Sequence, residues 1–325
     1  MLGKVLIGSR SFGKFTNEGI ELLKKNGCQI VGNPFPYAIK EKDLLNLISD
    51  IDGIITGMDQ LTKKVLNSST ALKVISKHGV GVDNIDIEAA SKKNIFVTNI
   101  PNVKEESNAV ADFTFALLLS IAKNICQSNE STKKGKWLKL IGSEVYGKTI
   151  GIIGGGVIGK SVIKRALGFG MNVLVYDLYK NEELVKNYNA EYVDLDYLFK
   201  NADFITIHVP LNHETKNLIG RKELKMMKKY SYLINTARGG IVNEKDLYEA
   251  LKEKRIAGAA LDVFLEEPPK TNPLLELDNL IATPHAAAYT MSCMCALDKI
   301  SAQNVIDVLK FSKPSEKYLV NKVLM

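Results

Sequence analysis

A glycine-rich turn in the middle of the chain constrains the fold most. Residues 149–177 contain an apolar run, the segment Gly154-Gly-Gly-Val-Ile-Gly159, a helical stretch and a second apolar run that ends at Asp177. The pattern predicts a dinucleotide-binding unit: Gly154, Gly156 and Gly159 permit a tight turn, close approach of backbone N–H groups to a pyrophosphate, and close packing of the helix on the strand. Its position near the middle of 325 residues indicates that a sizeable domain precedes it.

The acid after the second apolar run predicts the cofactor. Asp177 can accept both ribose hydroxyls of an adenosine and would repel a 2'-phosphate, which favours NAD over NADP. Lys180 lies nearby and keeps NADP as an alternative. A structural glycine turn followed by a surface aspartate is the competing interpretation.

Composition indicates an ordinary globular protein. The chain is long enough for two domains, and 46% of its residues are apolar. The longest strongly apolar stretch, 113–122, is too short to span a bilayer, and the N-terminus is typical of a strand rather than a secretion signal. We therefore expect a cytoplasmic protein without a membrane partner.

Charge and cysteine content argue against two other classes. The net charge of +7 comes from dispersed lysine pairs, so a solvated surface is favoured over nucleic-acid binding. The four cysteines have irregular spacing, which predicts neither a disulfide framework nor a metal site. Cys293 and Cys295 are expected to be ordinary helix positions, with a redox pair as the alternative.

The predicted elements form two α/β domains. Apolar strands are expected at 5–7, 29–31, 53–56, 74–76 and 96–98, with helices at 17–26, 40–49 and 86–93. A long helix (104–124) and a charged segment (131–139) precede the glycine turn, and later strands lie near 203–209, 231–235, 258–263 and 279–283, before a helix over 291–310. We expect two doubly wound parallel sheets with an interdomain cleft. The flavodoxin-like substrate-binding domain would contain 1–100 plus 287–325, and the Rossmann NAD-binding domain 101–286.

Three reactive side chains follow successive strands of the second domain: Arg238, Glu267 and His285. Open parallel sheets bind ligands at the carboxyl ends of their strands, so we expect these side chains at one rim. Arg238 would hold a carboxylate or polarise a carbonyl, His285 would donate a proton, and Glu267, paired to His285, would favour the imidazolium and fix its orientation. The set fits reversible hydride transfer to a 2-oxo acid. Each of these residues taken singly also has a structural explanation. Arg238 could form a loop ion pair, Glu267 could be a turn residue, and His285 could be a hydrogen-bonded buried imidazole.

Five segments together resemble the D-isomer-specific 2-hydroxyacid dehydrogenase family, and the match spans essentially the whole chain. They are Lys77-His-Gly-Val-Gly-Val-Asp-Asn-Ile-Asp, Gly154-Gly-Gly-Val-Ile-Gly, Asn235-Thr-Ala-Arg-Gly-Gly, Asp262-Val-Phe-Leu-Glu-Glu-Pro and Pro284-His. The resemblance implies a homodimer formed mainly through the nucleotide domains, and a last helix that returns to the first domain. Because the chain ends at Met325, we expect a phosphoglycerate dehydrogenase-like short form without a regulatory domain.

The resemblance also implies roles for single residues. Arg238 would bind substrate, with Glu267 and His285 as the proton-handling pair. Glu266 is a rival to Glu267, but the five-residue step from Asp262 favours Glu267. Asp262 itself would meet the nicotinamide carboxamide.

The remaining implied contacts concern the pyrophosphate and the substrate carboxylate. Val157 and Ile158 would meet the pyrophosphate, and the backbone of Val80 and Gly81 would form a carboxylate cradle. Three further residues near strand ends complete the predicted cofactor set: His208, Pro210 and Thr236. For His208, a hydrogen-bonded structural histidine is the alternative.

The identity of the acid depends on loops of the first domain. Arg10, in the Ser9-Arg10-Ser11 loop, is a candidate for binding a second anionic group such as a phosphate. The equally favoured alternative is a surface arginine without a ligand. Lys77 and His78 precede the carboxylate cradle, and either could shape the pocket. The chain is thus expected to be an NAD-dependent D-2-hydroxyacid dehydrogenase, and 3-phosphoglycerate is compatible with it. The alternative is an NAD-sensing interaction protein of the corepressor type on the same fold.

Overall fold

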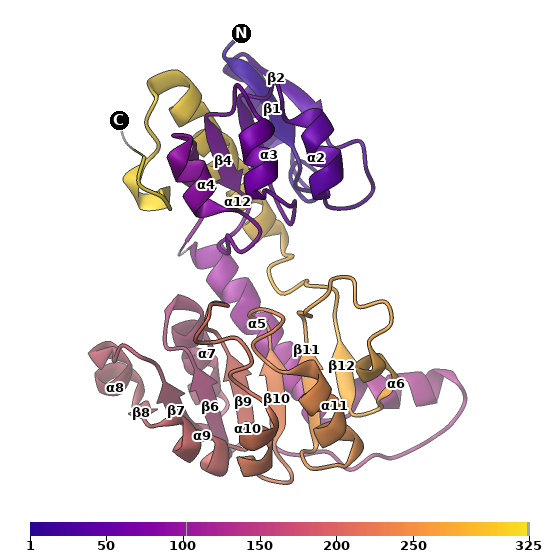
Figure 1. Ribbon diagram of the computed structural model, residues 1–325. Helices are drawn as coiled ribbons and strands as arrows, with labels where there is room; N and C mark the ends of the chain where they lie inside the picture. Colours follow the sequence, from indigo (N-terminus) through magenta and orange to yellow (C-terminus); the bar gives the residue numbers. More distant parts are fainter. Residues whose placement is uncertain (102, 324–325) are drawn as a thin grey trace. The chain divides into compact units, whose positions relative to one another are not determined.

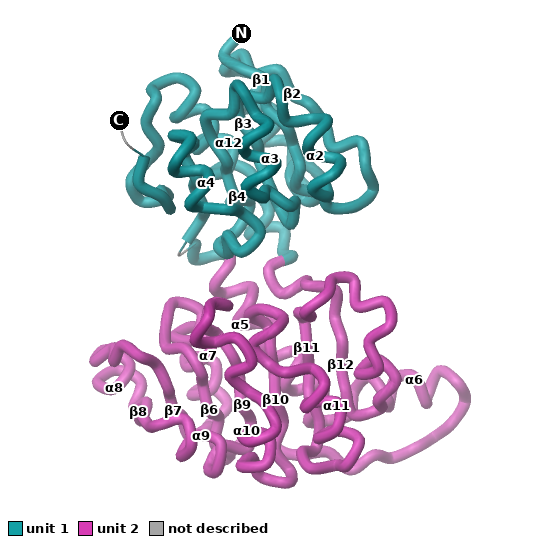
Figure 2. The backbone as a smooth tube through the Cα atoms, viewed as in Figure 1, with its two compact units in different colours: residues 1–105, 289–325 teal, residues 106–288 magenta. Residues whose placement is uncertain are grey.

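The computed structural model describes residues 1–101 and 103–323, which form two compact units (Figures 1 and 2). The smaller unit comprises residues 1–105 and 289–325, and the larger one comprises residues 106–288. The chain therefore crosses between units at 105/106 and 288/289, where the sequence predicted crossings at 100/101 and 286/287.

The smaller unit contains a parallel five-stranded sheet of order β2-β1-β3-β4-β5, which is the flavodoxin-like order. Its strands are β1 (Gly3–Ile7), β2 (Cys28–Gly32), β3 (Gly53–Thr56), β4 (Val74–Lys77) and β5 (Phe96–Thr98). Its helices are α1 (Glu18–Lys25), α2 (Glu41–Leu47), α3 (Lys63–Ser68), α4 (Ile87–Lys92) and α12 (Met291–Phe311), with a 3-10 turn at Glu316–Tyr318.

Strand β1 shows why this sheet is covered on both faces. Successive side chains of a strand point to opposite faces, and all three apolar residues at its end are buried. Leu6 belongs to one apolar core, while Val5 and Ile7 belong to a second core that α12 completes with Ala302 and Val305. Helix α12 thus returns to the first unit, as the family resemblance implied.

The larger unit contains a parallel seven-stranded sheet of order β12-β11-β10-β9-β6-β7-β8, with the Rossmann reversal of strand order between β6 and β9. Its strands are β6 (Thr149–Ile153), β7 (Asn172–Tyr176), β8 (Glu191–Tyr192), β9 (Phe204–Ile207), β10 (Tyr232–Asn235), β11 (Gly258–Leu261) and β12 (Leu280–Ala282). Its helices are α5 (Lys104–Ala122), α6 (Ile125–Lys133), α7 (Val157–Gly168), α8 (Glu182–Tyr188), α9 (Leu195–Asn201), α10 (Arg221–Met226) and α11 (Glu244–Lys252), with a 3-10 turn at Pro273–Glu276. Helix α5 begins two residues before the crossing at 105/106.

The seven-stranded sheet also separates two cores. On β6, Ile152 packs with Phe115 and Leu118 of α5, whereas Ile153 packs on the opposite face with Leu198 of α9. Both sheets are therefore doubly wound, as predicted. The carboxyl ends of their strands define one edge of each unit at which loops can hold a ligand.

The sequence prediction gave no ranges for α3, α6 or the short helices α8 to α11 between later strands of the larger sheet. Helix α3 has only six residues. Helix α6 overlaps the start of the predicted charged segment and has no buried residue, so it lacks the apolar periodicity that identifies a helix. The described residues contain no single helix that could cross a membrane by length and hydropathy. The pair α5 and α6 passes that test only together, and the two are bent by 62°.

Candidate active site

The glycine turn connects β6 to α7 at the carboxyl edge of the larger sheet. Gly154 has a φ of 103°, which side-chain-bearing residues rarely adopt. A Cβ at Gly159 would lie 2.0 Å from the carbonyl oxygen of Gly154, so the helix can approach the turn only with glycine there. Gly156 caps α7, and no described atom lies within 4 Å of a Cβ built on it. Open space at the N-terminus of a 12-residue helix fits a pyrophosphate.

Two polar side chains flank this turn. Asp177 follows β7 and accepts hydrogen bonds from the N–H of Gly155 at 2.7 Å and of Tyr179 at 3.0 Å, so the acid predicted to bind ribose lies against the turn. Both ring nitrogens of His208, which follows β9, are buried without a hydrogen-bonding partner in the described part of the chain. Burial lowers the pKa of His208 to about 3, so its imidazole is neutral at physiological pH. Buried unpaired nitrogens fit a position that gains a partner when a ligand binds.

The other predicted cofactor residues have less specific surroundings. Val157 is exposed at the start of α7 and Ile158 follows it, while Pro210 is exposed after β9. The hydroxyl of Thr236 is buried 3.0 Å from that of Thr114 on α5. These residues lie near the carboxyl edge, as their positions after strands required.

Asp262 fixes the loop that carries His285. Its carboxylate accepts hydrogen bonds from the Thr283 hydroxyl at 2.6 Å and from the N–H groups of Ala286 and Ala287 at 2.8 Å. The N–H of His285 also donates to the Asp262 carbonyl, and His285 has a φ of 53°. A left-handed conformation costs a non-glycine residue about 1–2 kcal/mol, and this hydrogen-bonded loop offsets it. Three of the roughly four acceptor positions of the carboxylate are occupied, which leaves one for the predicted carboxamide contact.

Glu267, and not its neighbour Glu266, lies against His285. Its Oε2 is 2.8 Å from Nδ1 of His285, and its Oε1 accepts the N–H of Phe264 at 3.1 Å. Burial alone would raise the pKa of Glu267. The hydrogen bond and charge of His285, the Phe264 N–H and the charge of Arg238 outweigh burial, so the pKa of this carboxyl lies below its ordinary value. Glu267 is therefore a carboxylate at neutral pH.

Arg238 belongs to the same electrostatic group. It follows β10, and the next residue, Gly239, packs so closely on the adjacent strand end that a Cβ would lie 2.0 Å from the backbone of Phe264. The guanidinium donates to the carbonyl of Ala237 at 2.7 Å and contributes to the lowered pKa of Glu267. The structure thus brings together the arginine, glutamate and histidine that the sequence predicted at one rim.

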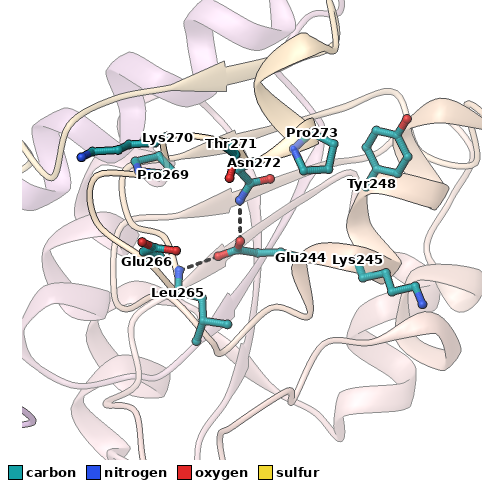
Figure 3. A pocket seen from close by; sticks show the side chains of 10 residues that line it. All are labelled: Glu244, Lys245, Tyr248, Leu265, Glu266, Pro269, Lys270, Thr271, Asn272 and Pro273. Carbon is teal, nitrogen blue, oxygen red and sulfur yellow. Dashed lines mark hydrogen bonds between the residues drawn. The ribbon is translucent and has the colours of Figure 1, made fainter.

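A residue that sequence reasoning missed holds the loop of Glu267. Glu244, the first residue of α11, accepts hydrogen bonds from the Leu265 N–H at 2.5 Å and from the Asn272 amide at 2.6 Å, near the two ends of that loop (Figure 3). A cavity of about 300 Å³ lies between α11 and the loop, with Glu266 on its wall. An acid in the first turn of a helix is ordinarily explained by the helix dipole, so the sequence carried no signal for this role.

In the smaller unit, the predicted carboxylate cradle follows β4. The carbonyl of Gly79 accepts the N–H of Ile100 at 3.0 Å, and the carbonyl of Val80 accepts the Asn99 amide at 2.7 Å. These bonds anchor the segment through its carbonyls, and the half-buried Gly81 completes it. The segment therefore has a defined conformation from which N–H groups can be presented.

The two basic candidates of this unit are engaged with its own backbone. The exposed Arg10 donates to the carbonyl of Pro36 at 3.2 Å. The buried Lys77 donates to the Gly57 carbonyl and, at 3.0 Å, to the Asn84 side chain. Lys77 consequently fixes the loop after β3, while Arg10 has the exposure that binding a soluble anion requires.

Comparison with known proteins places this geometry in context. Residues 115–287 match the family model described as "D-isomer specific 2-hydroxyacid dehydrogenase, NAD binding domain". A D-3-phosphoglycerate dehydrogenase of Methanocaldococcus jannaschii is 47% identical over 276 residues, covering 84% of this chain and 52% of the relative, so the chain spans about half of that protein's length. A glyoxylate reductase of Thermococcus litoralis is 42% identical over 297 residues, covering 88% of each chain.

Solved structures agree with these relatives. The D-lactate dehydrogenase of Aquifex aeolicus, described as complexed with NAD and lactic acid, superposes with a TM-score of 0.83 at 31% identity, covering 95% of this chain and 96% of that one. The larger unit is thus an NAD-binding domain, and the cofactor is NAD.

Proposed function

Because the chain belongs to the D-isomer-specific 2-hydroxyacid dehydrogenase family, we propose that it transfers a hydride reversibly between NAD(H) and a small D-2-hydroxy acid or the corresponding 2-oxo acid. The observation that supports this activity most directly is the 2.8 Å contact of Glu267 with His285, with the charge of Arg238 acting on the same carboxylate. A charged acceptor that orients an imidazole is the arrangement needed for a proton donor that must also take its proton back.

The proton-handling steps follow from the geometry of the pair. Since Nδ1 of His285 is held by Glu267, Nε2 is the nitrogen that would give a proton to the carbonyl oxygen during reduction and remove it from the hydroxyl during oxidation. Arg238 would bind the substrate carboxylate, because its planar guanidinium can donate two parallel hydrogen bonds. NADH, when bound, supplies the hydride to the carbonyl carbon.

The cofactor would be held by the residues around the glycine turn. We assign the pyrophosphate to the N-terminus of α7, at Gly156, and the adenosine ribose to Asp177. The open space at Gly156 and the position of Asp177 beside the turn support these assignments. His208 and Asp262 are proposed to line the nicotinamide end, where one has unpaired buried nitrogens and the other has one acceptor position left.

We propose 3-phosphoglycerate and glyoxylate, in that order, as the acids to test first. The phosphoglycerate relative has the higher identity, 47% against 42%, and the exposed Arg10 could bind a phosphate. Arg10→Ala should raise KM for 3-phosphoglycerate and leave KM for glyoxylate unchanged. An unchanged KM for the phosphorylated acid would remove the loop after β1 from phosphate binding.

A substrate panel tests the proposed activity. Purified protein should oxidise NADH with at least one of glyoxylate, hydroxypyruvate, pyruvate and phosphohydroxypyruvate. Tight NADH binding without turnover on any of them would favour the NAD-sensing alternative. The relatives named above are all called dehydrogenases or reductases, which gives no support to that alternative.

We also propose that the protein is a homodimer assembled through its NAD-binding domain. Helix α6, labelled in Figure 1, has no buried residue. The segment after it exposes Trp137 by 81%, Leu138 by 58% and Ile141 by 97%. Contiguous exposed apolar side chains are typical of a protein–protein interface. Light scattering should give twice the monomer mass for the wild type. A monomer at micromolar concentration would refute the assignment.

A further inference from the structure

The smaller unit contains a buried histidine–aspartate pair that the proposed mechanism does not use. His78 follows β4, and Asp298 lies on α12. Their atoms Nε2 and Oδ1 are 2.8 Å apart, and the two side chains are exposed by only 1% and 0%. Buried charged groups are rare in proteins unless they are paired, so this pair calls for a physical explanation.

The other nitrogen of His78 contacts two hydroxyls from the loop after β1. Nδ1 lies 3.3 Å from the Oγ of Ser9 and 3.2 Å from the Oγ of Ser11, and the two hydroxyls are 3.2 Å apart. All these contacts are satisfied when Nε2–H donates to Asp298 and Nδ1 shares a hydrogen bond with one serine hydroxyl, which in turn hydrogen-bonds the other. His78 thus bridges the β1 loop and α12.

Asp298 provides the second half of this connection. Its Oδ2 accepts the N–H of Gly13 at 2.9 Å, so one carboxylate binds both His78 and the β1 loop. The ring of Phe12, also in the β1 loop, packs edge-on against the imidazole of His78, with ring centroids 5.8 Å apart. Three segments far apart in sequence are therefore joined at one buried point.

The position of the cluster suggests what it does. His78 immediately precedes the 79–81 segment, and the β1 loop contains Arg10. Both follow strands of a parallel sheet at the edge where such sheets bind ligands. Replacing a buried polar or ionic pair by well-packed apolar groups is often neutral or stabilising, so overall stability does not explain this pair. The directional bonds of His78 therefore matter most for the geometry of the segment that follows it.

We propose that His78 and Asp298 are positioning residues for substrate binding. Their hydrogen bond fixes the backbone of residues 79–81 and the Ser9–Ser11 loop in the conformation that receives the substrate's anionic groups. The inference rests on the proposed dehydrogenase function. It assigns the pair a role in substrate affinity and none in proton transfer, since both ring nitrogens are engaged inside the protein.

Steady-state kinetics of reduction test this role. His78→Leu, which keeps the bulk and removes both polar contacts, should raise KM for the preferred 2-oxo acid roughly 10-fold, with kcat within about 3-fold of wild type, because uniform binding is what is lost. His78→Gln restores a donor toward Asp298 and should recover most of the affinity. Asp298→Asn keeps an acceptor for only one of its two donors and should give an intermediate KM. The dissociation constant of NADH should be unchanged in all three.

Asn321 provides a matched control for loss of stability. It is a buried polar residue of the same unit that accepts from Val97 N–H and donates to the Ile95 carbonyl, at the amino end of β5 and away from the ligand-binding edge. Asn321→Leu should lower the melting temperature and leave KM near the wild-type value.

The outcomes distinguish failure of the positioning role from failure of the proposed function. If the wild type turns over a 2-oxo acid but His78→Leu matches the wild type or the Asn321 variant in KM, the positioning role is wrong. If His78→Leu does not fold, the same judgement rests on His78→Gln and Asp298→Asn. If the wild type has no turnover with any acid of the panel, the proposed function fails and this inference fails with it.

Discussion

Replacing Glu267 by glutamine should shift the pH dependence of reduction to lower pH. The variant keeps the shape of the side chain and removes the negative charge 2.8 Å from Nδ1 of His285. Reduction needs the protonated imidazole, and the carboxylate stabilises that form in the wild type. Without that charge the imidazolium has lost its stabilising partner, so the alkaline decline in kcat/KM for the 2-oxo acid should begin at lower pH.

The size of the shift follows from the geometry of the pair. A hydrogen bond between charged partners contributes about 1.5–3 kcal/mol. The two side chains are exposed by 36% and 25%, so solvent screening favours the lower end of that range. Since about 1.4 kcal/mol corresponds to one pH unit, the midpoint of the alkaline decline should move down by about one unit.

The assay is NADH oxidation followed by absorbance across the pH range, with saturating NADH. Glu266→Gln is the matched control, because it removes the same charge one residue away, on the wall of the neighbouring cavity (Figure 3). Its profile should coincide with that of the wild type. If the midpoint for Glu267→Gln coincides with that of the wild type, or lies at higher pH, Glu267 does not stabilise the protonated form of His285, and its proposed role is wrong.

The same substitution has a consequence for stability. The pKa of Glu267 is lower in the folded protein than its ordinary value. Its ionised form therefore stabilises the fold above that ordinary value, and this contribution is lost as the pH falls through the lowered pKa. Urea unfolding of Glu267→Gln should accordingly show a weaker loss of stability on acidification than the wild type.

Three further substitutions test separate parts of the site. His285→Ala should lower kcat by about 10²- to 10⁴-fold with an unchanged dissociation constant for NADH, and a near-wild-type rate would exclude His285 as the proton donor. Gly159→Ala would place a Cβ 2.0 Å from the Gly154 carbonyl oxygen, so it should lower the free energy of unfolding in urea by about 1–3 kcal/mol. It should also weaken NADH binding measured by fluorescence, and unchanged binding would argue against this turn as the pyrophosphate site. Glu244→Ala leaves the Leu265 N–H and the Asn272 amide without their acceptor. Misplacing the Glu267 loop should lower kcat about 10-fold while NADH affinity is kept, and an unchanged kcat would mean that Glu244 is not needed to position that loop.

The predictable parts of this molecule are those in which local pattern and topology agree. Apolar runs ending in glycine or polar turns identify buried parallel strands, and the carboxyl ends of such strands must meet at one edge. That rule alone was enough to predict that Arg238, Glu267 and His285 gather in the larger unit. Their detailed contacts, such as the choice of Glu267 over Glu266, depended on backbone geometry that spacing only suggested.

The parts that could not be predicted are those set by contacts between distant residues. His78 and Asp298 are 220 positions apart, and an acid within a long helix is ordinarily expected to face solvent. Helix α6 contributes no side chain to the core, so no apolar period marks it. Glu244 holds the Glu267 loop through one backbone N–H and one amide, a contact that depends on where two separate segments lie.

The hydrogen-bonded pairs His285–Glu267 and His78–Asp298 show how burial assigns different roles to the same chemical groups. His285 is 36% exposed and bonded to a carboxylate through Nδ1, so its other nitrogen can reach a substrate. The side chain of His78 is 1% exposed, and both of its ring nitrogens lie within hydrogen-bonding distance of protein groups. It is therefore not available to exchange a proton with a ligand. The first pair is therefore suited to chemistry and the second to holding a backbone. If His78→Leu and His285→Ala both acted on kcat alone, this division by burial would be wrong.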